Sequence, residues 1–470
     1  MDLSRRELIG RSSALAAAAT LPACAKERGA SLPDFSDIEE RTFRGFWDHV
    51  NHSNGLVPDR WPSPSFSSIA AVGFALPAYA IGVERGWCSR ADARDLTLTT
   101  LRFLWNAPQG PDRTGTIGYK GFFYHFLEMQ SGQRHRRTEL SSVDSGILFM
   151  GALFAGQYYD RADAAEREIR ELADKLYGRA DWNYFRSDGR AAISMGWHPE
   201  DGLIERSWTG YNEGMLVNIL ALGSPTYPAA PGLWHQWTAP YPQCWRGSGP
   251  TRRLAFAPMF GHQYSHIFID FRGIRDAAMR EAGFDYFENS RRETYAQRAY
   301  AIANPMRWRG YSDKIWGITA CDGPGFAQLP YLGEKRTFFG YAARGPIDEP
   351  DGRDDGTIAP TAALGSLPFA PEIVIPCADA LRRWPGLFDR YGFKDSFNPS
   401  FTYTSARNGT GTIDPRFGWV AKDYIGIDQG AILLQATNYR NEFVWRTMRR
   451  SPAIRRGLTR AGFTGGWLRR

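Results

Sequence analysis

The chain has 470 residues, a formal net charge of +7 at pH 7 and 16 Trp among its 43% hydrophobic residues. Its basic residues are scattered and form no long run, so the charge argues against a nucleic-acid-binding protein. Beyond the N-terminal region no apolar run approaches the ~20 residues of a membrane-spanning helix, and the many tryptophans argue against a disordered chain.

Residues 1–23 have the pattern of an export signal. Arg5 and Arg6 precede a weakly apolar, Ala-rich run that ends in Leu21-Pro-Ala-Cys24. Adjacent arginines before a short apolar region are typical of a twin-arginine signal, and this cysteine is typical of a lipoprotein cleavage site. A buried Ala-rich helix is the alternative. We expect lipid attachment at Cys24, a tether over residues 24–35, and a lipoprotein of the periplasm or cell envelope with no other membrane contact.

Residues 36–470 are predicted to form one mainly helical domain, because no linker-like segment or shift in composition divides them. Three capping boxes precede or open amphipathic helices of the kind that covers a core: Ser36-x-x-Glu39, Asp163-x-x-Glu166 and Ser290-x-x-Glu293, the last with a helix that stops near Asn304-Pro305.

Other segments are apolar on most of their circumference and are predicted to be buried helices: Ile69–Ile81, Val143–Phe154 and Met215–Leu222. Alternation of amphipathic with buried helices suggests an outer ring around an inner ring. The Gly-, Pro- and Trp-rich segment Thr226–Arg253 and the segment Gly345–Gly356 are predicted to be loops that form the walls of a cleft.

The cysteines outside the signal are Cys88, Cys244, Cys321 and Cys377, and they have no CxxC or zinc-like spacing. We therefore expect buried free thiols, no metal site and no cofactor. His262, His266 and Asp270 are spaced four apart and imitate a metal triad, but Tyr264 lies between the histidines and no open catalytic position can be named. Hydrogen bonding to a glycan is the preferred interpretation of His262, Tyr264 and His266.

Three acids stand at the start of predicted buried helices: Asp144, Glu213 and Asp428. In a barrel of parallel inner helices, their side chains would emerge at one end. For any one of them alone, a helix-capping or first-turn carboxylate that interacts with the helix dipole is the preferred interpretation. Aromatic and glycine neighbours favour a sugar-binding cleft, since aromatic rings stack on sugars and glycine lets the backbone approach a ligand; these neighbours are Trp208, Gly210, Tyr211 and Gly430.

The chain resembles the bacterial glucoamylase-like domain family, which includes the endo-β-1,2-glucanases of glycoside hydrolase family 144. The resemblance spans roughly residues 36–464. It is carried by the following segments: Arg41–Trp47, Gly82–Gly86, Trp208–Glu213, Ala221–Thr226, His262–His266, Trp316–Asp322, Pro360–Ser366 and Ile427–Gly430. It implies an all-α (α/α)6 barrel, with long loops around the cleft.

The resemblance also implies an inverting two-carboxylate mechanism in which Glu213 is the general acid and Asp428 the general base. Asp144 is expected to bind substrate or to cap its helix. Trp208, Tyr211, Trp316 and Asp322 are expected to bind substrate, although Asp322 also fits an ordinary turn. A helix N-terminus lowers a carboxyl pKa, so burial has to outweigh the dipole at Glu213 if this residue is to be the acid.

The predicted function is that of an exported, monomeric glycoside hydrolase acting on an oligo- or polysaccharide, with β-1,2-glucan as the best single substrate. One alternative is a polysaccharide lyase that acts on a uronic-acid glycan through Tyr264 and one of the two histidines. Another is a glycan-binding lipoprotein without turnover.

Overall fold

The computed structural model describes residues 35–406 and 409–469. The predicted signal peptide, Cys24 and the predicted tether before Phe35 lie outside this part of the chain. None of the helices in the described part is both long and apolar enough to cross a membrane.

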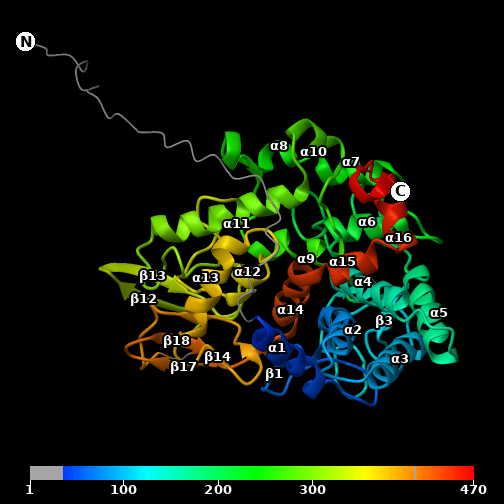
Figure 1. Cartoon of the computed structure of the whole chain (residues 1–470), viewed down its shortest axis with the longest axis horizontal. Helices are drawn as coiled ribbons and strands as arrows, with labels where there is room; N and C mark the ends of the chain where they lie inside the picture. Colours follow the sequence, from blue (N-terminus) through cyan, green and yellow to red (C-terminus); the bar gives the residue numbers. More distant parts are fainter. Residues whose placement is uncertain (1–34, 407–408, 470) are drawn as a thin grey trace, which may run out of the picture. The chain divides into compact units, whose positions relative to one another are not determined.

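Six helices of the described part form an inner ring around the core (Figure 1). They are α2 (Ile69–Glu84), α4 (Ser142–Tyr158), α6 (Met215–Gly223), α9 (Tyr264–Phe268), α12 (Pro360–Leu364) and α14 (Gly426–Asn441). Successive contacts run from α2 through α4 and α6 to α9, and from α12 through α14 back to α2. Between α9 and α12 the Gln263 side-chain amide donates a hydrogen bond of 2.9 Å to the carbonyl of Ala362.

Amphipathic helices cover this ring. They are α1 (Ser36–His49), α3 (Arg90–Asn106), α5 (Ala164–Gly178), α11 (Tyr286–Ala303), α13 (Pro371–Arg382) and α16 (Pro452–Arg460). For example, α1 packs on α14 and α2, α5 packs on α4, and α16 packs on α6. The remaining α-helices are short: α7 (Gly232–Thr238), α8 (Tyr241–Cys244), α10 (Ala277–Ala282) and α15 (Phe443–Met448). The prediction of an (α/α)6 barrel is confirmed.

The strands of the described residues form small antiparallel sheets of two or three strands between the helices. Three of them, β2 (Ser67–Ser68), β6 (Leu140–Ser141) and β19 (Tyr424–Ile425), run directly into α2, α4 and α14. Their partners are β5 (Phe126–Leu127), β7 (Gly196–His198) with β8 (Gly202–Leu203), and β1 (Arg60–Trp61).

The other pairs are β3 (Gly118–Tyr119) with β4 (Phe122–Phe123), β9 (Trp245–Arg246) with β10 (Arg253–Leu254), β11 (Ile274–Arg275) with β20 (Thr464–Gly465), β12 (Ala327–Tyr331) with β13 (Glu334–Phe338), and β14 (Phe388–Asp389) with β15 (Gly392–Phe393). A three-stranded sheet joins β16 (Phe397–Asn398), β18 (Gly418–Ala421) and β17 (Gly411–Asp414).

The three predicted buried helices are present as α2, α4 and α6, and their side chains are almost all buried. Close approach of α2 to α4 depends on glycine. A Cβ at Gly73 would lie 2.5 Å from the carbonyl oxygen of Ile147, and one at Gly151 would lie 2.1 Å from the carbonyl oxygen of Gly73. Larger residues would force these two helices apart.

Two of the three capping boxes were assigned to the wrong residues. Asp163 caps α5 as predicted, through a hydrogen bond from the Glu166 backbone N–H. Ser36, in contrast, is the first residue of α1 and not its N-cap, and Ser290 lies inside α11, which Asp285 caps. The hydroxyl of Ser290 instead donates to the carbonyl of His262, a tertiary contact. Segment Thr226–Arg253 is also not a plain loop, because it contains α7 and α8.

Candidate active site

The N-terminal ends of the inner helices are built alike. The residue before α2, α4 and α14 is Ser68, Ser141 or Ile425, and each has nearly the same extended backbone, with φ about −97° and ψ about 127°. Asp144 and Asp428 both lie in the first turn that follows. The same strand-to-helix turn therefore presents an acid at the same end of the ring, from two different helices.

Three of the acids act on one tyrosine, Tyr264, which is the first residue of α9. Burial raises the pKa of its phenol well above 10, and the negative charges of Asp428, Glu213 and Asp144 raise it further. The structure thus gathers three acids from three helix starts around one tyrosine. Because its phenol stays protonated, Tyr264 is a poor general base, which argues against the lyase alternative.

Glu213 lies in the turn before α6, and burial raises the pKa of its carboxyl group to about 7. The charge of Asp144 raises this pKa further, whereas the backbone N–H of Glu213 and the charge of Arg206 lower it. One carboxyl oxygen, Oε2, is buried with no hydrogen-bond partner in the described part of the chain. Burial therefore outweighs the helix dipole, and Glu213 can carry a proton near neutral pH, as a general acid must.

The Trp208 side chain packs against the turn that contains Glu213. A Cβ on Gly214 would lie 2.5 Å from the indole ring, so the ring packs directly under the residue after Glu213. The indole N–H donates a hydrogen bond of 2.8 Å to the hydroxyl of Ser142 at the start of α4. Trp208 thus ties the Glu213 turn to the helix that carries Asp144.

Asp428 lies beside a second acidic group. Its carboxyl group hydrogen-bonds to that of Asp395, and the charges of Asp322 and Asp59 act on it as well. Burial and these charges together raise the pKa of Asp428 well above its usual value. Arg60 partly balances the cluster, with its guanidinium 2.6 Å from Oδ2 of Asp322 and 3.2 Å from Oδ2 of Asp59.

His125, Glu139 and Asp144 form the cluster of described residues whose donor atoms could hold a metal ion, since these atoms lie within 4.8 Å of one another. Nδ1 of His125 lies 2.8 Å from Glu139, and Nε2 lies 3.5 Å from Asp144. Burial lowers the pKa of His125, but the charge of Asp144 and the contact with Glu139 outweigh this and raise it to about 9. An imidazolium has no free lone pair, so we interpret His125 as a cation that bridges two carboxylates.

Seven of the eight predicted substrate-binding residues, all except Asp144, are buried: Trp208, Tyr211, His262, Tyr264, His266, Trp316 and Asp322. The Tyr211 ring stacks on Tyr286 and contacts His262. Burial lowers the pKa of His266 to about 3, and its Nε2 lies 3.1 Å from the hydroxyl of Ser290. Tyr211 and His266 thus have partners within the core, and direct contact of the predicted residues with a glycan stays a prediction.

Other predicted contacts also have structural roles. Gly430 makes room for Phe74, because a Cβ there would lie 2.4 Å from its ring. Gly210 has a positive φ of 75°, which a turn requires. Helix α9 ends at Phe268, before Asp270, so Asp270 does not share a helix face with the two histidines. Its carboxyl group instead forms an ion pair of 2.8 Å with Arg272.

Tyr341, which the sequence analysis did not select, is the aromatic residue that faces the acids. The residue is 54% exposed, but burial of its phenol, followed by the charges of Asp428, Asp395 and Asp59, raises its pKa well above 10. It follows β13 and is held by a backbone bridge between Cys321 and Ala342. A half-exposed ring beside the acids has the position that sugar stacking requires.

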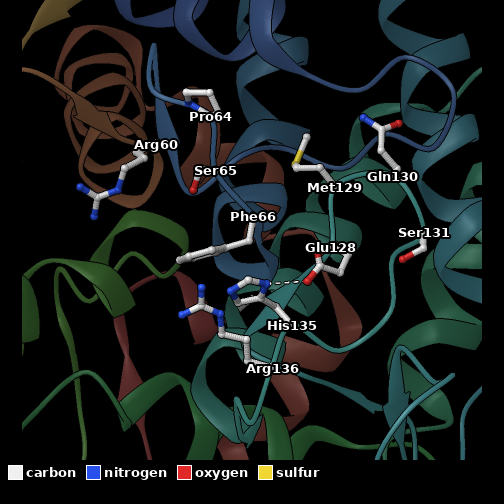
Figure 2. A pocket seen from close by; sticks show the side chains of 10 residues that line it. All are labelled: Arg60, Pro64, Ser65, Phe66, Glu128, Met129, Gln130, Ser131, His135 and Arg136. Carbon is white, nitrogen blue, oxygen red and sulfur yellow. Dashed lines mark hydrogen bonds and ion pairs between the residues drawn. The ribbon is translucent and has the colours of Figure 1, made fainter.

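A pocket of about 710 Å³ lies next to the acids and shares Arg60 with them (Figure 2). Phe66 lies over His135, with ring centroids 4.6 Å apart, and His135 Nδ1 lies 2.7 Å from Glu128. Arg136 lines the same pocket with a positive φ of 50°, an uncommon conformation for a side chain of this size. The pocket thus adjoins the acidic cluster through Arg60.

The site residues that sequence analysis missed are Asp59, Arg60, His125, Glu139, Tyr341 and Asp395. The sequence did contain a signal for two of them, since Asp59 precedes the strand β1 and Arg60 begins it, and β1 pairs with β19, which runs into α14. Asp395 offered no such signal, because only the tertiary fold brings it to Asp428.

Comparisons with known proteins were consistent with this site. A sequence model of the family described as "Putative glucoamylase" matches residues 205–452. A solved structure from Bacteroides uniformis ATCC 8492, with the same description, is 30% identical, has a TM-score of 0.77, and covers 94% of this chain and 100% of its own. The endo-β-1,2-glucanase from Chitinophaga pinensis is 24% identical, with a TM-score of 0.75 and coverage of 92% and 98%.

A curated relative is the exo β-1,2-glucooligosaccharide sophorohydrolase (non-reducing end) of Parabacteroides distasonis, 24% identical over 454 residues. The match covers 90% of this chain and 56% of that protein, so the chain spans about half the length of this relative. The family match extends over more than half of the chain, and the fold is shared from end to end with a structure of 30% identity. This chain therefore belongs to the glucoamylase-like (Glycoamylase) family.

Proposed function

We propose that this protein is a glycoside hydrolase that cleaves β-1,2-glucan with inversion of configuration. The observation that carries the proposal is the pairing of a protonated acid with an acidic pair that holds a negative charge, both at the same end of the barrel. Glu213 has its pKa raised to about 7 by burial, and Asp428 shares a hydrogen bond with Asp395. Hydrolysis of an acetal with inversion needs one group of each kind.

In this mechanism Glu213 protonates the leaving oxygen, and the acidic pair takes a proton from the attacking water. Tyr341 stacks on a sugar ring, and the pocket next to Arg60 accepts sugar units farther along the chain. The choice of β-1,2-glucan is supported by the described activities of the relatives from Chitinophaga pinensis and Parabacteroides distasonis.

The test is release of new reducing ends from a panel of β-1,2-, β-1,3-, β-1,6- and α-glucans. We expect cleavage of the β-1,2-glucan, with the product sizes identifying internal or terminal attack. Cleavage of a different glucan alone would contradict the substrate assignment. Tight oligosaccharide binding without cleavage over long incubation would instead support a binding protein.

We also propose that the protein is a monomer, exported by the twin-arginine route and anchored through lipid on Cys24. The support is the Arg5-Arg6 pair and the Leu21–Cys24 segment. Changing both arginines to Lys should retain the protein in the cytoplasm. Cys24→Ser should abolish labelling by a fatty acid and leave activity intact, and persistent labelling would contradict the anchor. Size-exclusion chromatography tests the monomer.

A further inference from the structure

Asp395 is held in place from several sides. It lies between β15 and β16, and its backbone N–H donates a hydrogen bond of 3.0 Å to the carbonyl of Asp423. Its carboxyl oxygen Oδ2 accepts a hydrogen bond of 2.6 Å from the backbone N–H of Asp322 and one of 3.3 Å from the hydroxyl of Ser396. The side chain is thus fixed with little freedom to rotate.

The carboxyl group of Asp395 also contacts the carboxyl group of Asp428. The two side chains hydrogen-bond to each other, and each residue is only 2% exposed. Oδ1 of Asp395 and Oδ2 of Asp428 are buried, and no donor group among the described residues hydrogen-bonds to either oxygen. Two carboxylates cannot hydrogen-bond unless one of them carries a proton, so the pair holds one proton between its members.

The surroundings determine which member holds the negative charge. The backbone N–H of Asp322 donates to Asp395, whereas the Ser396 hydroxyl lies closer to the carbonyl of Asp322, at 2.7 Å; the positive charge of Arg60 also acts on Asp395. Burial and the charge of Asp322 raise the pKa of Asp395 to about 7, and burial and the charge of Asp395 raise the pKa of Asp428 well above its usual value. The titratable and charged groups that face the pair are Asp59, Arg60, Tyr264, Asp322, Tyr341 and Arg344, together with the Cys321 thiol. At rest, Asp395 is the ionised member and Asp428 the protonated one.

We infer that Asp395 is a positioning residue that exchanges a proton with Asp428, so that the two carboxyl groups together, and not Asp428 alone, accept the proton of the attacking water. This inference rests on the proposed function. The water oxygen bonds to the anomeric carbon as the bond to the leaving oxygen breaks, and the leaving oxygen takes the proton of Glu213. One water proton passes to Asp428 while the proton of Asp428 moves to Asp395. The pair goes from one negative charge to none, and Glu213 gains one.

The kinetic test uses Asp395→Asn in the full chain. Loss of the base should lower kcat by about 10²- to 10⁴-fold with little change in KM. The acidic limb of the pH profile should move to lower pH, because the remaining carboxyl group loses its negatively charged neighbour. Azide, which attacks without a base, should restore turnover and form a glycosyl azide.

Asp354→Asn is the matched control, because Asp354 is a buried acid bound by two tyrosine hydroxyls, with its pKa raised to about 6. It should leave the pH profile unchanged. A normal kcat for Asp395→Asn, or a loss of kcat that azide does not restore and that leaves the pH profile unchanged, would overturn the inference.

Infrared spectroscopy of the substrate-free protein tests the shared proton directly. The carbonyl stretch of a protonated carboxyl group should be present near neutral pH and should lose one component in Asp395→Asn and, independently, in Asp428→Asn. A separate buried acid pair, Glu293 with Glu349, should keep its own component in both variants. Spectra identical to wild type would refute the shared proton. Because this measurement needs no substrate, it stands even if the panel of glucans shows no cleavage.

Discussion

The negative charge of Asp144 acts on the carboxyl group of Glu213 and adds to the effect of burial on its pKa. The two residues come from different strand-to-helix turns, joined by the hydrogen bond from Trp208 to Ser142. A residue at the start of α4 therefore adjusts the acidity of the proposed general acid before α6. Two predictions follow from this coupling, and three others from the rest of the site.

The pH profile should report the coupling. A general acid works only when protonated, so kcat/KM should fall above pH 7, as Glu213 loses its proton. Asp144→Asn removes a like charge, lowers the pKa of Glu213 and should move this basic limb to lower pH. Glu171→Gln, an exposed acid on α5, is the control and should leave the limb in place. An unmoved limb in Asp144→Asn would show that the two groups are not coupled.

The raised pKa of Glu213 should also make the folded protein less stable at high pH. The pKa of Glu213 is raised from 4.5 to about 7 in the folded protein. Below pH 4.5 both states bind the proton, and above pH 7 the folded state must bury a charge that the unfolded state exposes to water. Glu213→Gln should therefore raise the free energy of unfolding by about 3 kcal/mol at pH 8 and change it little at pH 4. Urea unfolding at both pH values measures this; equal effects at both would contradict the raised pKa.

The chemistry itself is tested by the two conservative variants Glu213→Gln and Asp428→Asn. Each should lower kcat by about 10²- to 10⁴-fold while the protein stays folded, because each removes a proton donor or acceptor. Asp144→Asn should act more on KM. Proton NMR of the first product should show the anomer opposite to the cleaved linkage. A retained anomer would exclude a base role for Asp428, and near-normal turnover by Glu213→Gln would exclude Glu213 as the acid.

Tyr341 should contribute to binding through its ring. Tyr341→Ala should raise KM about tenfold, the equivalent of about 1.4 kcal/mol, whereas Tyr341→Phe keeps the stacking surface and should stay near the wild-type value. Ile302→Ala, an exposed apolar residue on α11, is the control for loss of surface. An unchanged KM in Tyr341→Ala would show that the sugar chain does not pass over this ring.

Chelation tests the interpretation of His125. If this side chain is an imidazolium between Glu139 and Asp144, exhaustive treatment with EDTA should leave activity unchanged. His125→Gln should instead alter the pH profile, because it removes a positive charge beside Asp144. Loss of activity on chelation, restored by a divalent ion, would mean that the cluster holds a metal.

Much of the barrel could be predicted from the sequence. The segments that became α2, α4 and α6 are apolar all round, which no exposed helix tolerates, and Asp163 caps α5 through a local hydrogen bond. The capping pattern failed at Ser290, because Asp285 and Glu288 form an equally good start five residues earlier. Local patterns predict that a helix exists more reliably than where it begins.

The site was predictable only as far as it depends on helix starts. Asp144 and Asp428 lie in first turns, and Glu213 lies just before one, so their shared end of the ring follows from the pattern of buried helices. The aromatic residues were not predictable, since Trp208, Tyr211 and Trp316 are as hydrophobic inside a core as they are useful in a cleft. Tyr341 and Trp316 differ in exposure, which depends on the packing around them and not on residue type.

The sequence by itself determined the buried helices and the acids at their starts, because burial and capping depend on residues a few positions apart. Only the tertiary structure decided the charges of those acids. Asp395 and Asp428 come together because the segment between β15 and β16 meets the start of α14 in the fold, and Glu213 holds a proton near pH 7 because burial raises its pKa. Electrostatic effects of this kind depend on distance and burial in space, which the order of residues does not specify.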